Sequence, residues 1–144
     1  MSFGWSGARR NVADLKSFRR RIAKHAKNVE TNSNKNIIRM AVLIDQVVTV
    51  GTPVDTGHAR ANWQATIGAE TTEVLDEEDP SGATAMANAR AVLEGRQTEQ
   101  TIHITNNVKY VPRLNEGSSA QAPAGFVQTA VNTAVSAFKR MKLL

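Results

Sequence analysis

The chain has 144 residues, 41% of them hydrophobic, and its 18 basic and 13 acidic side chains give a formal net charge of +5. This length predicts one domain over residues 1–144 that can bury a core without disulfides or metal. The absence of cysteine excludes disulfides, thiolate metal sites and cysteine nucleophiles. Without a signal-peptide pattern or an apolar run of the roughly 20 residues that span a membrane, we expect a cytoplasm-like environment.

Charge is distributed unevenly along the chain. Ten of the 18 basic residues fall between Arg9 and Arg39, and six of the 13 acidic residues fall between Glu70 and Asp79. Such asymmetry suggests nucleic acid, an acidic surface or a neighbouring copy of the same chain as a partner. Aromatic residues make up only 5% of the chain, so platforms for stacking single-stranded bases are scarce.

The N-terminal third reads as helical. Residues 1–8 are rich in glycine and serine and are predicted to be a flexible lead-in. From Arg9 to Glu30 apolar residues recur at helical spacings, which predicts an amphipathic basic helix. The polar stretch Thr31–Asn36 either breaks this helix or provides a fresh N-cap. A second, more apolar helix is predicted over Ile37–Val50, with Gly51 as the residue that follows its end.

The remainder mixes short strands and helices. Strands are predicted at 62–69, at 101–105 and, on a sheet edge because of Pro112, at 110–114. Helices are predicted at 83–93 and 126–141, and the acidic stretch 70–80 is predicted to be an exposed loop. The fold class is therefore α+β: a long N-terminal helical segment, a small mostly antiparallel sheet, a short middle helix and a C-terminal helix.

The residues of catalytic type do not cluster in the sequence. His25, His58 and His103 are isolated and lack the spacing of metal ligands. Asp55 and His58 are three residues apart, but the run from Pro53 through Asp55 to Gly57 has the chemistry of a tight turn, in which Gly57 takes a positive φ. We expect a protein that is not an enzyme, with no catalytic residue, no metal and no cofactor.

The basic helix has two interpretations. Clustered lysines and arginines can bind DNA phosphates, or they can form a solvated face that docks the acidic segment of a neighbour. No DNA-recognition motif accompanies the helix, and its apolar face lacks the bulk expected for membrane binding. The candidate residues for contact with a neighbouring subunit or DNA are Arg19, Arg20, Arg21, Lys24 and Lys27.

Two loops, over 52–63 and 110–126, contain prolines, which restrict the backbone, and glycines, which allow backbone conformations that other residues resist. Long loops of this composition are often functional. We expect the turn around Gly57 to pack near the loop 116–125 and to present a surface to other proteins. The candidate residues of this interface are Pro53, Asp55, Thr56, Gly57, Arg60, Trp63, Tyr110, Glu116, Gly117, Gln121, Pro123 and Gly125.

These loops resemble two signatures of phage tail-completion proteins, the neck proteins related to the minor tail protein Z group. The first is Pro-Val-Asp-Thr-Gly-x-x-Arg-x-x-Trp, from Pro53 to Trp63. The second has paired asparagines at the end of a strand, then a tyrosine, an acidic residue with glycine, and the run Gln-Ala-Pro-x-Gly that ends here at Gly125. The similarity runs from about Ala8 into the C-terminal helix, although Lys109 stands where the family commonly has proline.

The resemblance implies a non-enzymatic virion protein of the head–tail junction. Its expected partners are further copies of itself in a ring, with six as the natural number, together with portal or adaptor proteins and tail tube or tail terminator proteins. The resemblance implies assembly in the host cytoplasm and a place in the neck or tail of the virion. From its charge, we expect the basic helix to meet either the acidic segment of the next subunit or, non-specifically, DNA in the lumen, and we expect no membrane partner. The alternative is a small basic DNA-binding protein.

Overall fold

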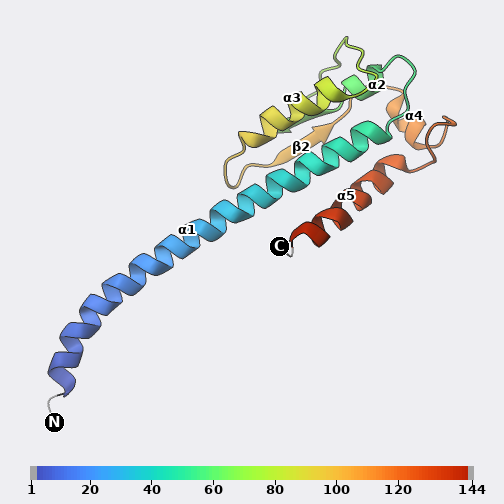
Figure 1. Ribbon diagram of the computed structural model, residues 1–144. Helices are drawn as coiled ribbons and strands as arrows, with labels where there is room; N and C mark the ends of the chain where they lie inside the picture. The colour runs from blue at the N-terminus through green and yellow to red at the C-terminus, as the bar shows by residue number, and fades with distance from the viewer. Residues whose placement is uncertain (1–2, 143–144) are drawn as a thin grey trace. The chain divides into compact units, whose positions relative to one another are not determined.

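The computed structural model describes the backbone of residues 3–142 and the side chains of residues 15–140. In chain order, its elements are α1 (Phe3–Gly51), α2 (His58–Ala61), β1 (Gln64–Ile67), α3 (Ala83–Glu94), β2 (Ile102–Thr105), α4 (Val111–Asn115) and α5 (Phe126–Lys142) (Figure 1). The predicted α+β class is confirmed, with a two-stranded antiparallel sheet among the described residues.

Helix α1 is a single helix of 49 residues, so the predicted break at Thr31–Asn36 is wrong. The stretch contains neither glycine nor proline. The Thr31 hydroxyl donates a hydrogen bond to the Lys27 carbonyl over 2.9 Å, and this bond along the helix leaves the backbone ladder intact. The helix begins at Phe3, so residues 3–8 have a helical backbone instead of the predicted irregular lead-in, and Gly51 is its last helical residue.

The chain divides into two units within α1, between Asn34 and Lys35. In the first unit, every described side chain from Leu15 to Ser33 is exposed. The second unit contains the rest of α1 and all other elements.

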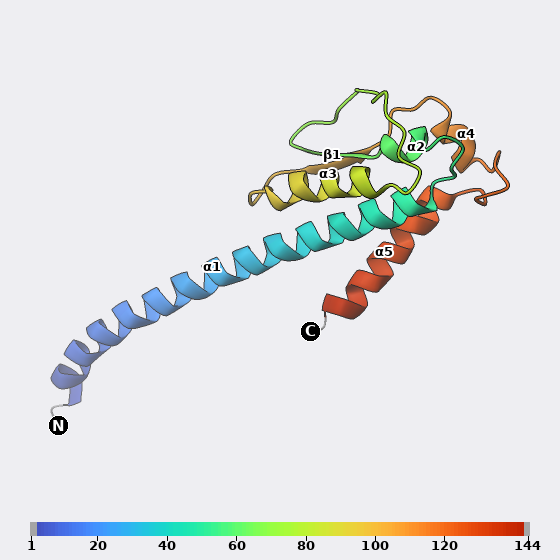
Figure 2. The ribbon, with the colours of Figure 1, turned by 45° about the horizontal axis from the view of Figure 1, so that its top comes forward.

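The core of the second unit lies on one face of the sheet. Strands β1 and β2 pair from Gln64↔Thr105 to Ile67↔Ile102, and α3 packs along β1 (Figure 2). Ala65 of β1 packs in one cluster with Ala41 of α1 and with Ala89 and Leu93 of α3. This cluster joins the three elements because small alanines allow the helices to approach the sheet closely. Two smaller clusters also belong to the core, one formed by Val48, Trp63 and Ala130 and the other by Ala59, Val108 and Val111.

The edge strand predicted at 110–114 is wrong, because this segment begins the short helix α4. Pro112 lies in the first helical turn, where no intrahelical N–H bond is needed and the fixed φ of proline suits the helix. The same residue that suggested a sheet edge therefore starts a helix. The short helix α2 was not predicted, and the two predicted strands are shorter, reduced to four residues each.

Asp45 is a buried carboxyl on the core side of α1, with 1% of its surface exposed. Its Oδ1 atom and the hydroxyl of Thr49, one turn further on, have no hydrogen-bond partner among the described residues. Burial raises the pKa of Asp45 from 3.8 to about 7, because the apolar surroundings disfavour the charged form.

This raised pKa predicts a specific dependence of stability on pH. The unfolded chain ionises Asp45 near pH 3.8 and the folded chain near pH 7, so the stability contributed by the neutral carboxyl is complete below the lower value and is lost as pH rises to the higher one. Relative to Asp45→Asn, the free energy of unfolding of the wild type should fall by up to about 1.4 kcal/mol per pH unit in that window. Urea unfolding on either side of the window measures it.

Thr49→Val is the matched control, since it removes an unpaired hydroxyl from the same helix face without removing a charge. Its stability difference from the wild type should be the same at both ends of the window. If the difference between wild type and Asp45→Asn were also independent of pH, the raised pKa would be contradicted.

Candidate functional site

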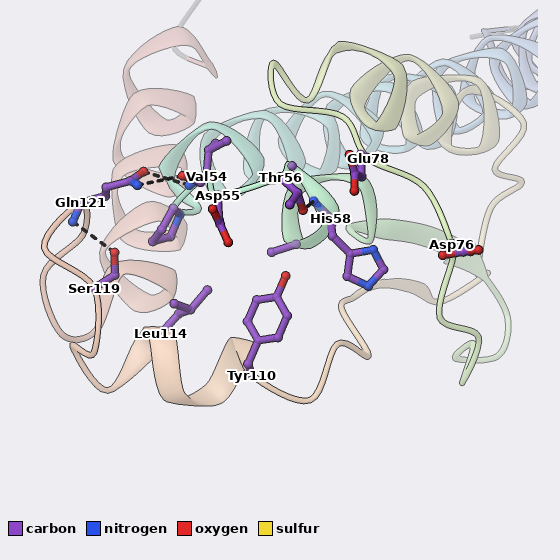
Figure 3. A pocket seen from close by; sticks show the side chains of 13 residues that line it. Val54, Asp55, Thr56, His58, Asp76, Glu78, Tyr110, Leu114, Ser119 and Gln121 are labelled. Atoms are coloured by element: carbon purple, nitrogen blue, oxygen red, sulfur yellow. Dashed lines mark hydrogen bonds between the residues drawn. The ribbon is translucent and has the colours of Figure 1, made fainter.

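The two loops singled out in the sequence enclose a cleft of about 630 Å³ in the second unit. Its lining comes from three stretches of the chain: Pro53–Ala59, the acidic segment with Asp76 and Glu78, and the region of α4 and the loop after it (Figure 3). Tyr110 and Leu114 project from the α4 side toward the stretch that holds Asp55. The cleft therefore depends on how each stretch is anchored.

Gly57 holds the first stretch against the acidic segment. Its φ is +92°, which confirms the positive φ predicted for this turn. The Gly57 carbonyl accepts hydrogen bonds from the amides of Ala61 and Asp79, over 2.9 and 3.0 Å. A Cβ atom at position 57 would overlap the backbone of Asp79 and Pro80. Only glycine therefore combines this conformation with such close approach of two chain segments.

Arg60 fixes the end of α1. Its Nε donates to the Thr52 carbonyl over 2.8 Å, and its Nη2 donates to the Val50 carbonyl over 2.7 Å. Carbonyls at a helix C-terminus lack intrahelical partners and attract a cation. The remaining nitrogen, Nη1, donates to the Pro80 carbonyl over 2.8 Å. The guanidinium thus ties the end of α1 to the acidic segment, and its donors face the chain's own backbone.

Trp63 also contacts the end of α1. Its indole N–H donates to the Thr52 hydroxyl over 2.7 Å, and that hydroxyl donates to the Val48 carbonyl over 2.7 Å. The ring packs with Val48 and with Ala130 of α5. Thr52, which is completely buried, was missed in the sequence. Its position four residues after Val48 could have predicted the bond from its hydroxyl to the Val48 carbonyl, because threonine side chains often bond the carbonyl four residues earlier in a helix.

Gln121 joins the second loop to the first. Its side-chain amide donates to the Val54 carbonyl over 2.7 Å and accepts from the Val54 amide over 2.9 Å, although the two residues are 67 positions apart. The predicted proximity of the two loops is therefore confirmed. Asn115, the last residue of α4, accepts a hydrogen bond through its side chain from the Val127 amide in the first turn of α5. Asn115 was not among the predicted residues.

Buried and half-buried asparagine amides attach the acidic segment to the body. Asn62 is completely buried; its amide group donates to the Leu75 carbonyl over 3.0 Å and accepts from the Leu75 amide over 2.6 Å. The Asn107 amide donates to the carbonyls of Thr71 and Glu73. Four carboxylates of the segment, those of Glu73, Asp76, Glu77 and Glu78, are left exposed on the surface. The half-buried Asp79 instead accepts a hydrogen bond from the Ala85 amide over 2.9 Å.

The structure brings together only part of the predicted set. The cleft is lined by Pro53, Asp55, Thr56, Gly57, Tyr110 and Gln121. Arg60 and Trp63 support the first loop from inside the chain. Glu116, Gly117, Pro123 and Gly125 do not line it, although Gly117 and Gly125 both have positive φ. Arg19, Arg20, Arg21, Lys24 and Lys27 lie in the first unit and are exposed.

The cleft has an acidic and partly apolar character. Asp55, Asp76 and Glu78 contribute carboxylates, and no lysine or arginine is present in the lining. The ion pairs found between described residues are Arg90–Glu94 and His103–Glu70, so none of these three carboxylates is paired. Asp55 also forms no hydrogen bond with His58 in this part of the chain; the His58 ring lies 3.1 Å from the Glu77 carbonyl through its Nδ1.

Among the side chains that the structure describes, residues 15–140, no group of three or more metal-ligating side chains is found. No helix of the described chain is long and apolar enough to cross a membrane. No family model, curated protein or solved structure matches this chain.

The crowding at Gly57 predicts a large stability loss for Gly57→Ala. Both the left-handed conformation and the overlap with backbone oppose the methyl group, so we expect a loss of more than about 2 kcal/mol in the free energy of unfolding. Gly68→Ala is the matched control, since Gly68 has a φ of +90° and open space around its Cβ position. It should lose about 1–2 kcal/mol. Equal losses in urea unfolding would contradict the close approach at Gly57.

The three bonds of Arg60 predict that charge alone does not replace it. Arg60→Lys keeps the cation but removes the planar fork, so at least one of the three carbonyls loses its donor. We expect a loss of about 1–3 kcal/mol in thermal or urea unfolding. Arg113→Lys, at an exposed position of α4, is the control and should be nearly neutral. Similar losses in both variants would show that the guanidinium geometry at position 60 does not matter.

Proposed function

We propose that this chain is a structural protein of the phage neck, which completes the tail and joins it to the head connector. The observation that carries the proposal is the pairing of Gln121 with Val54, which unites the two motif-bearing loops into one surface. The resemblance to tail-completion proteins was drawn from these same loops. Because the two motifs form one surface, a single binding role can account for both of them.

The use of the motif side chains supports a structural role over catalysis. Arg60, Trp63 and Gln121 direct their hydrogen bonds to the chain's own backbone or to a buried hydroxyl. They thereby define a shape and leave no donor array for a substrate. Asp55 forms no hydrogen bond with His58 among the described residues, so the acid–base pair suggested by their spacing has no direct contact to support it.

The distribution of charge supports assembly into a ring around the DNA channel. A head-to-tail contact joins two different surfaces and closes into a ring when its rotation allows. The exposed basic residues of the first unit and the exposed carboxylates of the second are two such surfaces. We propose six copies, as tail symmetry implies, in contact with portal or adaptor rings and with tail tube or terminator proteins, after assembly in the host cytoplasm.

One observation favours a second function, a small basic DNA-binding protein. The basic side chains from Arg19 to Lys27 are exposed on a helix and can contact phosphates without reading sequence. Binding of this kind weakens steeply with salt, by about one log unit of affinity per log of salt for each phosphate contacted. Tight binding to duplex DNA with that salt dependence, in a phage that joins its tails without the protein, would favour this function.

Deletion of the gene from the phage or prophage genome that carries it tests the proposed function. We expect lysates that contain filled heads and separate tails by negative-stain electron microscopy, with few joined particles. Supply of the wild-type chain from a plasmid should restore joining. Joined, infectious particles in the absence of the protein would overturn the proposal.

A further inference from the structure

The described part of the first unit presents an exposed apolar stripe. Leu15, Phe18, Ile22 and Val29 have between 47% and 53% of their surface exposed. At 100° per residue these four positions fall within roughly 60° of the helix circumference. Helices in water gain most of their stability by packing such a stripe against another surface. The stripe is thus the side of the helix that a partner would cover.

The charge of the same segment restricts the partner. Residues 15–30 contain a single acidic residue, Glu30. The basic residues in that range are Lys16, Arg19, Arg20, Arg21, Lys24 and Lys27. None of them belongs to an ion pair that the structure describes. A matching surface must therefore be both acidic and partly apolar.

The cleft of the second unit has this composition. Asp76 and Glu78 line it with unpaired carboxylates, and Val54, Tyr110 and Leu114 line it with apolar surface. Tyr110 keeps 42% of its surface exposed. The adjoining acidic segment adds a further exposed apolar side chain, Val74, with 49% of its surface exposed.

We propose that residues 15–30 of one copy dock on the cleft and the acidic segment 70–79 of a second copy. The proposal rests on the proposed function, because it names the contact that would build the ring. Pairing of two basic helices would place like charges together, which is unfavourable. DNA would neutralise the basic side chains but would leave both the apolar stripe and the acidic cleft uncovered.

Charge exchange between the two surfaces tests the contact. Arg19 and Arg21 flank the apolar stripe on its two sides, so Arg19→Glu/Arg21→Glu should raise the concentration needed for half-assembly at least about tenfold. Asp76→Arg/Glu78→Arg should do the same from the other surface. A chain with all four substitutions should recover part of the lost assembly, because the new glutamates of one copy can then pair with the new arginines of the next. Light scattering of the full chain over a concentration series at low salt measures the mass.

Lys139→Glu/Arg140→Glu is the matched control, since it makes the same charge change on exposed residues of α5. It should leave the mass unchanged. The proposal is overturned if the wild type stays monomeric, if either paired variant assembles like the wild type, or if the four-site chain fails to recover. Assembly that strengthens with salt would indicate pairing of basic helices instead. Loss of duplex-DNA binding in Arg19→Glu/Arg21→Glu with intact assembly would indicate DNA as the partner.

The gene-deletion experiment separates this proposal from the proposed function. Heads and tails that stay unjoined without the gene, together with assembly insensitive to all charge changes, would retain the function and remove only this contact. Joined particles without the gene would remove the function, whatever the charge variants do in solution.

Discussion

The end of helix α1 is the point on which the second unit depends. Three groups meet there: the carbonyls of the last helical turn, the guanidinium of Arg60 and the hydroxyl of Thr52, which also receives the Trp63 indole. Carbonyls at a helix C-terminus must find donors outside the helix. Here the donors come from the next turns of the chain, so satisfying the helix also sets the path of the first loop. The Pro80 carbonyl extends the arrangement to the acidic segment.

The cleft follows from this anchoring and is mainly a matter of shape. Its first wall is held by Arg60 and Gly57, and its second wall is attached to the first through Gln121. The side chains that form these attachments are amides, a guanidinium and an indole, which suit hydrogen bonding to backbone. The cleft carboxylates of Asp55, Asp76 and Glu78 take no part in these attachments and form no ion pair among the described residues. The amide, guanidinium and indole groups thus hold the walls of the cleft together, and its carboxylates stay available to a partner.

Local pattern was sufficient for most elements and for one feature of the site. The helix α3 was predicted from its alanine-rich composition, the C-terminal helix and both strands from the spacing of their apolar residues, and the positive φ of Gly57 from turn chemistry. The segment at Pro112 failed because proline is compatible both with a sheet edge and with a first helical turn. The roles of Arg60 and Asn62 were beyond sequence reasoning, since their partners Pro80 and Leu75 lie 20 and 13 residues away. From the sequence alone, an asparagine indicates a turn. Its role as a buried side chain that bonds a distant backbone segment is visible only from tertiary contacts.

The polar stretch inside α1 has a consequence for how the chain unfolds. Thr31, Ser33 and the neighbouring asparagines have low helix propensity, and the boundary between the two units falls among them. Little free energy is needed to melt a helix at such a stretch, and nothing in the core of the second unit is opened by doing so. Heating or denaturant would therefore act on the chain in two stages. The cooperative transition that a calorimeter records belongs to the second unit, and the amide protons of the first would exchange with solvent well before it.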